Sequence, residues 1–247
     1  MNKALLFCVV LSLLGGCAGA KSGMPIDSPS RDRQFRDHFL KNVTRLTTDG
    51  DNGEAYFSGD GKKLIFQSSR EGYACDKIWT MNIDGSDKRM VSPNHGAHTC
   101  SYFLPDGRIV FSSTSHIPGD CPPKPQSPPG VRYVWPLHPY DILIAAADGS
   151  NARRLTDNPK YDAEPVVSPD GKRIVFGSQR EGDFDIYSMN ADGTDVRRMT
   201  DRVGYDGGPW YSPDGSKIVW RAWYPATVDE KARWKDAGYW LTLPFAL

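Results

Sequence analysis

The chain has 247 residues, and its 30 lysines and arginines are balanced by 30 aspartates and glutamates. No basic cluster with interleaved aromatic residues interrupts this balance, which argues against a nucleic-acid partner. The sequence contains no serine nucleophile elbow, His-Glu-x-x-His motif, phosphate-binding loop or dinucleotide fingerprint. We therefore assign no catalytic residue and no cofactor, and we expect the protein not to be an enzyme.

The N-terminus predicts a lipoprotein signal peptide over residues 1–16. Lys3 precedes an apolar run from Ala4 to Leu14, which is too short for a transmembrane helix and typical of a signal peptide. The following Leu-Gly-Gly-Cys resembles a bacterial lipobox, and this resemblance implies acylation (palmitate-type chains) of Cys17. An ordinary secretory signal is the alternative. Two or three acyl chains would anchor the protein stably, since each buried methylene contributes ~0.8 kcal/mol.

The residue after the lipidated cysteine indicates whether a lipoprotein stays in the inner membrane or reaches the outer membrane. Ala18 follows Cys17, so the aspartate that retains lipoproteins in the inner membrane is absent. The lipobox resemblance therefore implies the periplasmic face of the outer membrane. Residues 17–38 are rich in Ser, Pro, Asp, Arg and Lys, and we expect the lipidated cysteine to be followed by a flexible tether.

A tandem repeat fills most of the remaining chain. A first Asp-Gly turn recurs at spacings of 46, 64 and 44 residues, and a second recurs at spacings of 64 and 44. The second turn always precedes the next first turn by 22 residues, so the longer spacing reflects one insertion in the second copy. A period in the forties with short alternating apolar runs is typical of propeller blades. The turns begin at Asp60, Asp106, Asp170 and Asp214, and at Asp84, Asp148 and Asp192.

The third copy gives the clearest prediction of four strands. Its inner strand is expected at Pro165–Ser168, and the turn Ser-Pro-Asp-Gly follows. Two further strands are expected at Arg173–Ser178 and Asp185–Asn190, and an outer strand at Asp195–Thr200. One four-stranded sheet cannot bury both of its faces, so the blades must stack.

The elements Ser-Pro-Asp-Gly, Ser-x-Arg and Asp-Ile-Tyr-x-Met-x-x-Asp-Gly resemble the repeats of TolB-like β-propellers. The resemblance covers roughly Val43 to Tyr224, and we assign residues 39–226 to an all-β propeller of four-stranded blades. It implies the fold strongly and the function weakly, because similar repeats occur in propeller domains of prolyl-oligopeptidase-type peptidases and of some sugar lyases. Propellers of this kind commonly have six blades, whereas this chain supplies under four.

The insertion in the second copy, residues 114–139, contains eight prolines together with Tyr133, Trp135 and His138. It is expected to be either a stiff lid over its own blade or a partner-docking surface. Three cysteines, Cys75, Cys100 and Cys121, remain for an oxidising compartment. One disulfide is expected, with Cys100 as its most plausible member, joined to either of the other two.

The blade end where the inner strands start is the best candidate binding site. The rim candidates by alignment are Arg70, His98, Trp135, Asp162, Glu164, Arg180 and Asp206. We expect Arg70 and Arg180, from the Ser-x-Arg element, to pair with an acidic residue such as Glu54 or Glu164. Hydrogen bonding between loops is the simplest role for the other polar residues. His95, His98 and His116 match no metal-ligand spacing, so no metal site is assigned. Arg153-Arg154 and Arg197-Arg198 are expected to be solvated on outer strands.

Both ends of the repeat region look unfinished. Val43–Thr47 matches an outer strand that lacks a preceding blade, and the fourth copy ends after its second strand. Residues 227–247 are expected to form a short helix, with Thr227 and Glu230 as a capping box and Gly238 as a stop, and then an apolar tail. The chain is expected to be truncated, or to cover its exposed blade faces by self-association.

Together these features predict a lipid-anchored periplasmic propeller that acts as a protein-interaction or envelope scaffold and binds a periplasmic or outer-membrane protein. The alternatives are the propeller part of a peptidase or hydrolase whose catalytic domain is absent from this chain, and a propeller that binds a sugar or another small ligand.

Overall fold

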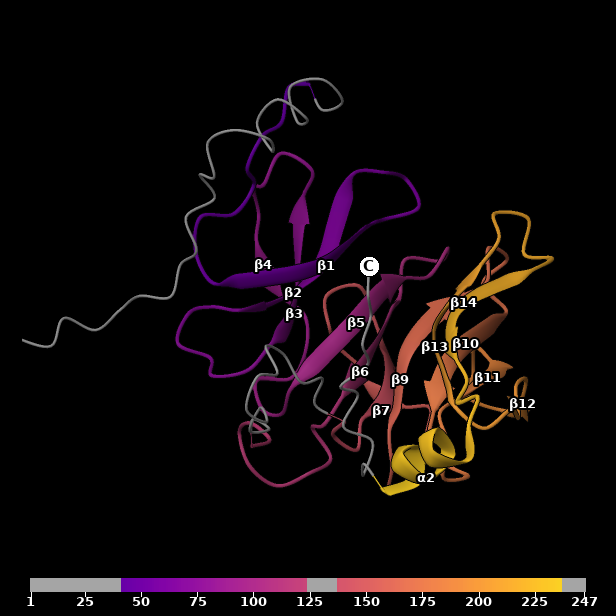
Figure 1. Cartoon of the computed structure of the whole chain (residues 1–247). Coiled ribbons are helices and arrows are strands. Elements are labelled where there is room, and N and C mark those ends of the chain that lie inside the picture. Colours follow the sequence, from indigo (N-terminus) through magenta and orange to yellow (C-terminus); the bar gives the residue numbers. More distant parts are fainter. Residues whose placement is uncertain (1–40, 124–136, 237–247) are drawn as a thin grey trace, which may run out of the picture. The chain divides into compact units, whose positions relative to one another are not determined.

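The computed structural model describes residues 41–123 and 137–236, which form antiparallel β-sheets and one helix (Figure 1). The chain divides into two compact units between Arg45 and Leu46, and every strand belongs to the second unit. The predicted signal peptide, Cys17, the whole tether, the centre of the insertion with Trp135, and the tail after Asp236 lie outside the described residues.

The sheets are blades of an incomplete β-propeller, as the repeats predict. Three blades have four strands in chain order, and the described part of the fourth has two. Blade 1 contains β1 (Asp51–Phe57), β2 (Lys63–Ser69), β3 (Lys77–Asn82) and β4 (Arg89–Met90); blade 2 contains β5 (His98–Phe103), β6 (Ile109–Ser113), β7 (Asp141–Ala145) and β8 (Arg153–Arg154). Blade 3 contains β9 (Asp162–Val167), β10 (Arg173–Ser178), β11 (Asp185–Asn190) and β12 (Arg197–Arg198); β13 (Tyr205–Tyr211) and β14 (Ile218–Trp223) form blade 4, and α2 (Val228–Asp236) follows.

The two middle strands of blade 3 lie where the sequence predicts them, and the flanking strands differ. β9 begins three residues before the predicted Pro165, because a β-bulge lets the chain pair with β10 on both sides of Glu164. β12 has only Arg197 and Arg198, so the outer strand is shorter than predicted. The bulge adds one residue without ending the strand, which alternation alone does not reveal.

Every inner strand carries this bulge at the same repeat position. The register shifts after Gly53 in β1, after Thr99 in β5 and after Gly207 in β13, as it does beside Glu164 in β9. The residue at each bulge has a positive φ, from 48° to 59°. Only one of the four is a glycine, so three blades hold a non-glycine residue in the left-handed region. These four residues are Glu54, Cys100, Glu164 and Gly208.

Stacked blades bury both faces of β10, which explains why its alternation does not separate buried from exposed positions. Ile174 and Phe176 pack in one cluster with Val110 and Ile142 of blade 2. On the other face, Val175 packs with Tyr211 and Ile218 of blade 4. Apolar residues on both faces of each strand therefore hold successive blades together.

Backbone contacts also join each blade to the next. The first residue of an inner strand donates its N–H to a carbonyl at the start of the preceding blade's third strand: His98 to Asp76 at 2.9 Å, and Asp162 to Tyr140 at 3.0 Å. The second Asp-Gly turn approaches the preceding blade so closely that a Cβ on Gly149 would lie 2.2 Å from the Val91 oxygen. Glycine at this turn is thus required by packing as well as by its φ of +84°.

Arg154 and Arg198 are not merely solvated, contrary to the expectation for the outer-strand arginine pairs. Arg198 donates to the fully buried Asp185 at 2.7 Å, and Arg154 contacts the equivalent Asp141. A threonine two residues further on completes the same arrangement, since Thr156 donates to Asp141 at 3.0 Å. The expectation fails because these arginines reach back over the third strand to a carboxylate that the sequence places 13 residues earlier.

The chain ends behave partly as predicted. No strand forms over Val43–Thr47, yet Leu46 packs against Gly85 just as Leu155 packs against Gly193. The helix begins where its capping box predicts, with Thr227 accepting from Glu230 N–H at 3.1 Å and Glu230 accepting from Thr227 N–H at 3.0 Å. Its predicted stop at Gly238 lies outside the described residues. Across the described ranges no helix has the length and apolar character needed to cross a membrane.

Candidate functional site

Three of the predicted rim residues, His98, Asp162 and Asp206, occupy one repeated position at the start of the inner strands, and Arg70 and Arg180 follow the second strands of blades 1 and 3. Here "loop rim" means the blade ends that carry these starts and the loops joining second to third strands. Arg180 donates to Asp162 at 3.0 Å, and Arg70 donates to Asn52 at 2.7 Å in the equivalent place. The expected acidic partner is therefore confirmed, since Arg180 pairs with Asp162 and Arg70 lies 3.5 Å from Asp49, but the named examples Glu54 and Glu164 are wrong. The reason is the bulge, which turns the glutamates away from the arginine side of the blade.

Blades 2 and 4, which lack this arginine, fill the position differently. In blade 4, Tyr224 donates to Asp206 at 2.7 Å and Trp220 donates to the same oxygen at 2.9 Å. In blade 2, His98 Nε2 lies 3.1 Å from the Pro93 oxygen and 3.0 Å from the His95 oxygen. His98, Asp162 and Asp206 thus bond through their side chains to their own blade or to the loop beside it.

Burial shifts the pKa values of two of these rim residues, His98 and Asp162. His98, Asp162 and Asp206 are fully buried. Burial lowers the pKa of His98 to about 3, so its ring is neutral at neutral pH. Burial raises the pKa of Asp162 to about 6, although Ser178 and Arg180 oppose this shift. Buried and already bonded, these side chains are suited to closing the blades rather than to meeting a ligand.

The bulge residues, in contrast, lie close to one another across neighbouring blades. Cys100 lies among the carboxylates of Glu54 and Glu164, and Glu164 accepts from Gly208 N–H at 2.7 Å and from Arg221 at 3.2 Å. Burial, and then both glutamates, raise the pKa of the Cys100 thiol. A thiol held neutral in this way is a poor nucleophile, so Cys100 is not activated for thiolate chemistry.

A cluster of three aromatic residues lies on the inner strands two positions after the bulge residues, and the sequence analysis missed it. The ring centroids of Tyr56 and Tyr102 are 4.2 Å apart, and Trp210 lies 5.4 Å and 5.1 Å from them. Burial raises the pKa of both tyrosines. The signal was available, because each aromatic residue comes two positions after a bulge residue. Trp210 remains 42% exposed, so the cluster has an accessible edge.

The disulfide joins Cys75 to Cys121, whereas Cys100 is free and buried. The expectation that Cys100 would be a member of the pair is therefore wrong. Cys100 occupies the bulge of β5, while the other two cysteines lie in the long loops of blades 1 and 2 at the loop rim. Gly96 N–H donates to Asp120 O at 2.8 Å, which brings the loop of blade 2 beside Cys75.

The described flanks of the insertion pack against blade 3. Leu137 and Tyr140 belong to a cluster with Tyr161 and Phe184, and the ring centroids of His138 and Tyr140 are 5.9 Å apart. Burial lowers the pKa of His138. At these flanks the insertion behaves as part of the fold, and its role as a docking surface stays a prediction.

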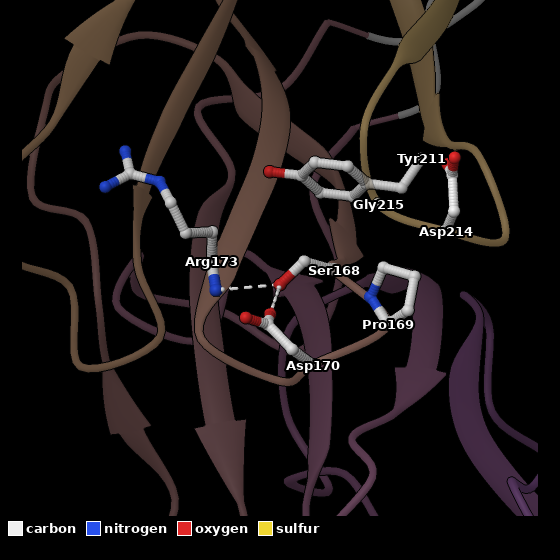
Figure 2. Close-up of a pocket in the computed structure, with 7 residues that line it drawn as sticks. All are labelled: Ser168, Pro169, Asp170, Arg173, Tyr211, Asp214 and Gly215. Atoms are coloured by element: carbon white, nitrogen blue, oxygen red, sulfur yellow. Dashed lines mark hydrogen bonds between the residues drawn. The ribbon is translucent and has the colours of Figure 1, made fainter.

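A pocket of about 470 Å³ lies on the opposite end of the blades, between the Asp-Gly turns of blades 3 and 4 (Figure 2). Figure 2 shows the Tyr211 hydroxyl directed toward the side on which Arg173 lies. Two charged residues that line the pocket already have partners: Asp170 accepts from Ser168 at 2.7 Å, and Arg173 pairs with Asp195 at 3.0 Å. We assign this pocket no ligand. Among the described residues, no three His, Cys, Asp or Glu side chains are grouped to hold a metal ion.

Comparison with known proteins agrees with the repeat motif. The family described as the TolB beta propeller domain matches residues 127–226. The Tol-Pal system protein TolB of Bordetella pertussis is 47% identical over 45 residues, which cover 18% of this chain and 10% of that protein. An uncharacterized protein of Agrobacterium fabrum is 36% identical over 129 residues, which cover 52% of this chain and 36% of that protein.

Solved structures show the same fold at low sequence identity. A putative TolB from Agrobacterium tumefaciens superposes with a TM-score of 0.56 and 23% identity, over 72% of this chain and 57% of that one. TolB from Acinetobacter baumannii gives a TM-score of 0.54 and 22% identity, over 70% of this chain and 38% of that one. In each case the match spans less than two thirds of the relative's own length.

Proposed function

We propose that this TolB-like β-propeller repeat protein is a lipid-anchored scaffold at the periplasmic face of the outer membrane, where it binds a protein partner and catalyses no reaction. The repeat builds blades in which the rim residues His98, Asp162 and Asp206 are fully buried. A protein partner would therefore bind other, exposed parts of the surface.

The exposure of apolar residues in blade 4 carries this proposal. Val219 is 66% exposed, whereas Val175 and Ile65, at the same position in blades 3 and 1, are fully buried. Trp220 is likewise 39% exposed, although its equivalent Phe176 is buried. Exposed apolar surface of this kind is typical of sites that bind another protein.

The comparisons support a partner in the cell envelope. The Bordetella relative is named as a protein of the Tol-Pal system. That name describes the relative, and a similar partner for this chain is part of the proposal. Self-association is the competing outcome, because a second copy would cover the same apolar residues.

Site-specific photo-crosslinking in intact cells tests the binding surface. A crosslinking residue at Val219 should give a discrete product containing a second, different protein, whereas one at Asp106, an exposed turn residue of blade 2, should not. A product containing only two copies of this chain would replace the scaffold with self-association. Equal products from both positions, or none from Val219, would overturn the proposed binding surface.

The anchor is tested separately at Cys17. Cys17→Ser should move the protein from the membrane fraction to the soluble periplasmic fraction, and it should abolish the mass added by acyl chains. Cys8→Ser, within the predicted signal peptide, is the matched control and should leave the protein in the membrane. Membrane retention without Cys17 would contradict the lipid anchor but not the binding surface.

A further inference from the structure

Lys77 is a buried charge in a place where the other blades have the opposite charge. It is 1% exposed and stands at the first position of β3, where blade 2 has Asp141 and blade 3 has Asp185. Those aspartates bind an arginine on the outer strand, but the corresponding residue of blade 1 is Met90. Blade 1 therefore buries an ammonium group that plays no part in this outer-strand ion pair, although burying a charge is costly.

The surroundings of Lys77 place its charge against the disulfide. Its Nζ lies 3.6 Å from the sulfur of Cys75, which is bonded to Cys121, and it donates to the Gly96 oxygen. The Tyr73 ring centroid is 5.2 Å from the same nitrogen. Both cysteines are only partly buried, so a small reductant has access to the bond.

We propose that Cys75–Cys121 is a redox-active disulfide that exchanges with an external dithiol, and that Lys77 stabilises the Cys75 thiolate that leaves when the bond is broken. A positive charge beside a cysteine favours its thiolate, and a better leaving group is displaced faster. This inference does not depend on the proposed scaffold function.

The exchange balances in two steps. One thiolate of the dithiol attacks the sulfur of Cys121, the disulfide bond breaks, and its electron pair passes to the sulfur of Cys75 beside Lys77. The second thiol of the reductant then loses its proton and attacks the mixed disulfide. Cys121 leaves and takes up a proton, so two electrons pass to the protein and the dithiol becomes a disulfide.

Other groups near Cys75 act on the same equilibrium. The oxygens of Gly96 and Asp120 lie 3.4 Å and 3.5 Å from its sulfur and would accept a hydrogen bond from the neutral thiol. Burial lowers the pKa of Lys77, and the carboxylates of Asp120 and Asp76 oppose this shift. The full positive charge of Lys77 at contact distance should favour the Cys75 thiolate by more than the two neutral carbonyl groups favour the thiol. Reduction would detach the loop of blade 1 from that of blade 2.

The test compares reduction of the oxidised full chain by dithiothreitol, followed by trapping with a maleimide under denaturing conditions. Lys77→Met keeps the length of the side chain without its charge, and it should slow reduction about tenfold and shift the equilibrium about tenfold toward the disulfide. Lys88→Met, at an exposed lysine of the same blade, controls for the lost charge and should behave as the unsubstituted chain.

Equal behaviour of Lys77→Met and Lys88→Met would overturn the proposal, as would purification of the chain with all three cysteines free. If Lys77→Met fails to fold, the reduced unsubstituted protein decides the question through the pH dependence of alkylation. Cys75 should then be alkylated at lower pH than Cys121. A midpoint for Cys75 equal to or above that of Cys121 would overturn the proposal.

Discussion

Arg180 reaches across blade 3 to Asp162 and donates to its carboxylate at 3.0 Å, although Asp162 is fully buried. Ser178 donates to the other oxygen of the same carboxylate at 2.5 Å. These bonds favour the ionised form, but burial outweighs them and raises the pKa of Asp162 to about 6. The folded protein therefore disfavours the ionised form of Asp162 despite these two hydrogen bonds.

The raised pKa gives Asp162 a defined effect on stability. Because the folded pKa lies above the unfolded value of 3.8, this group stabilises the fold below about pH 4, and that contribution is lost as pH rises through 6. Asp162→Asn cannot ionise. Relative to the unsubstituted protein, its unfolding free energy should thus improve by roughly 2–3 kcal/mol between pH 4 and pH 7.5. Asn52, which accepts from Arg70 in blade 1, shows that an amide fits this position.

Urea unfolding at the two pH values measures this difference. Asp201→Asn, at an exposed aspartate, is the matched control and should change little with pH. A difference between Asp162→Asn and the unsubstituted chain that stays constant from pH 4 to 7.5, or that reverses sign, would show that the pKa of Asp162 is not raised.

Gly149→Ala should destabilise the protein by more than the cost of placing an alanine at a positive φ, because the new side chain would also clash with a neighbouring blade. The new Cβ would lie 2.2 Å from the Val91 oxygen and would push blades 1 and 2 apart. Gly107→Ala is the matched control, since Gly107 has a similar φ of +88° with no atom within 4 Å of the new Cβ. We expect a loss of roughly 1–2 kcal/mol for Gly107→Ala and at least about 2 kcal/mol more for Gly149→Ala. Equal urea midpoints for the two variants would contradict this interpretation of the turn.

Arg198→Met and Arg197→Met compare two adjacent arginines of one outer strand. Removing Arg198 leaves the buried Asp185 without its cation, so the unfolding free energy should fall by roughly 2–4 kcal/mol. Arg197 is 67% exposed and pairs with Asp195 at the surface, and its removal should cost about 0.5 kcal/mol or less. Burial already raises the pKa of Asp185 to about 6, so the loss for Arg198→Met should be larger at pH 7.5 than at pH 5. Similar losses for both variants would refute the role of the buried pair.

Alternation and turn chemistry were sufficient to predict the middle strands of the blades. β10 and β11 begin and end at the predicted residues, because Asp-Gly turns and apolar periodicity are both local signals. The bulges were not predicted, since Glu54, Cys100 and Glu164 adopt a conformation that their residue types disfavour. Only Gly208, at the same position in blade 4, carries a local signal for it.

The candidate site was harder to predict than the fold because it depends on which way each strand turns its side chains. The bulge turns Glu164 toward Gly208 of blade 4 and leaves Asp162 as the acidic partner of Arg180. The disulfide depends on the path of two long loops, and spacing along the chain contains no information about that path. Repeat alignment finds equivalent positions, but it does not show which neighbour each position meets.

The helix α2 provides a last prediction, because its capping box and its docking can be separated. Thr227→Ala removes the oxygen that accepts from Glu230 N–H, and it should weaken the first turn by about 1 kcal/mol. Thr227→Ser keeps that oxygen and is the control. Trp234, which donates to Asp183 at 2.8 Å, is untouched in both variants, so the blades should keep their stability. Hydrogen exchange should accordingly be faster over residues 228–232 in Thr227→Ala alone, with no change in blades 1 to 3. Equal exchange in the alanine and serine variants would mean that docking through Trp234, and not the cap, holds the helix in place.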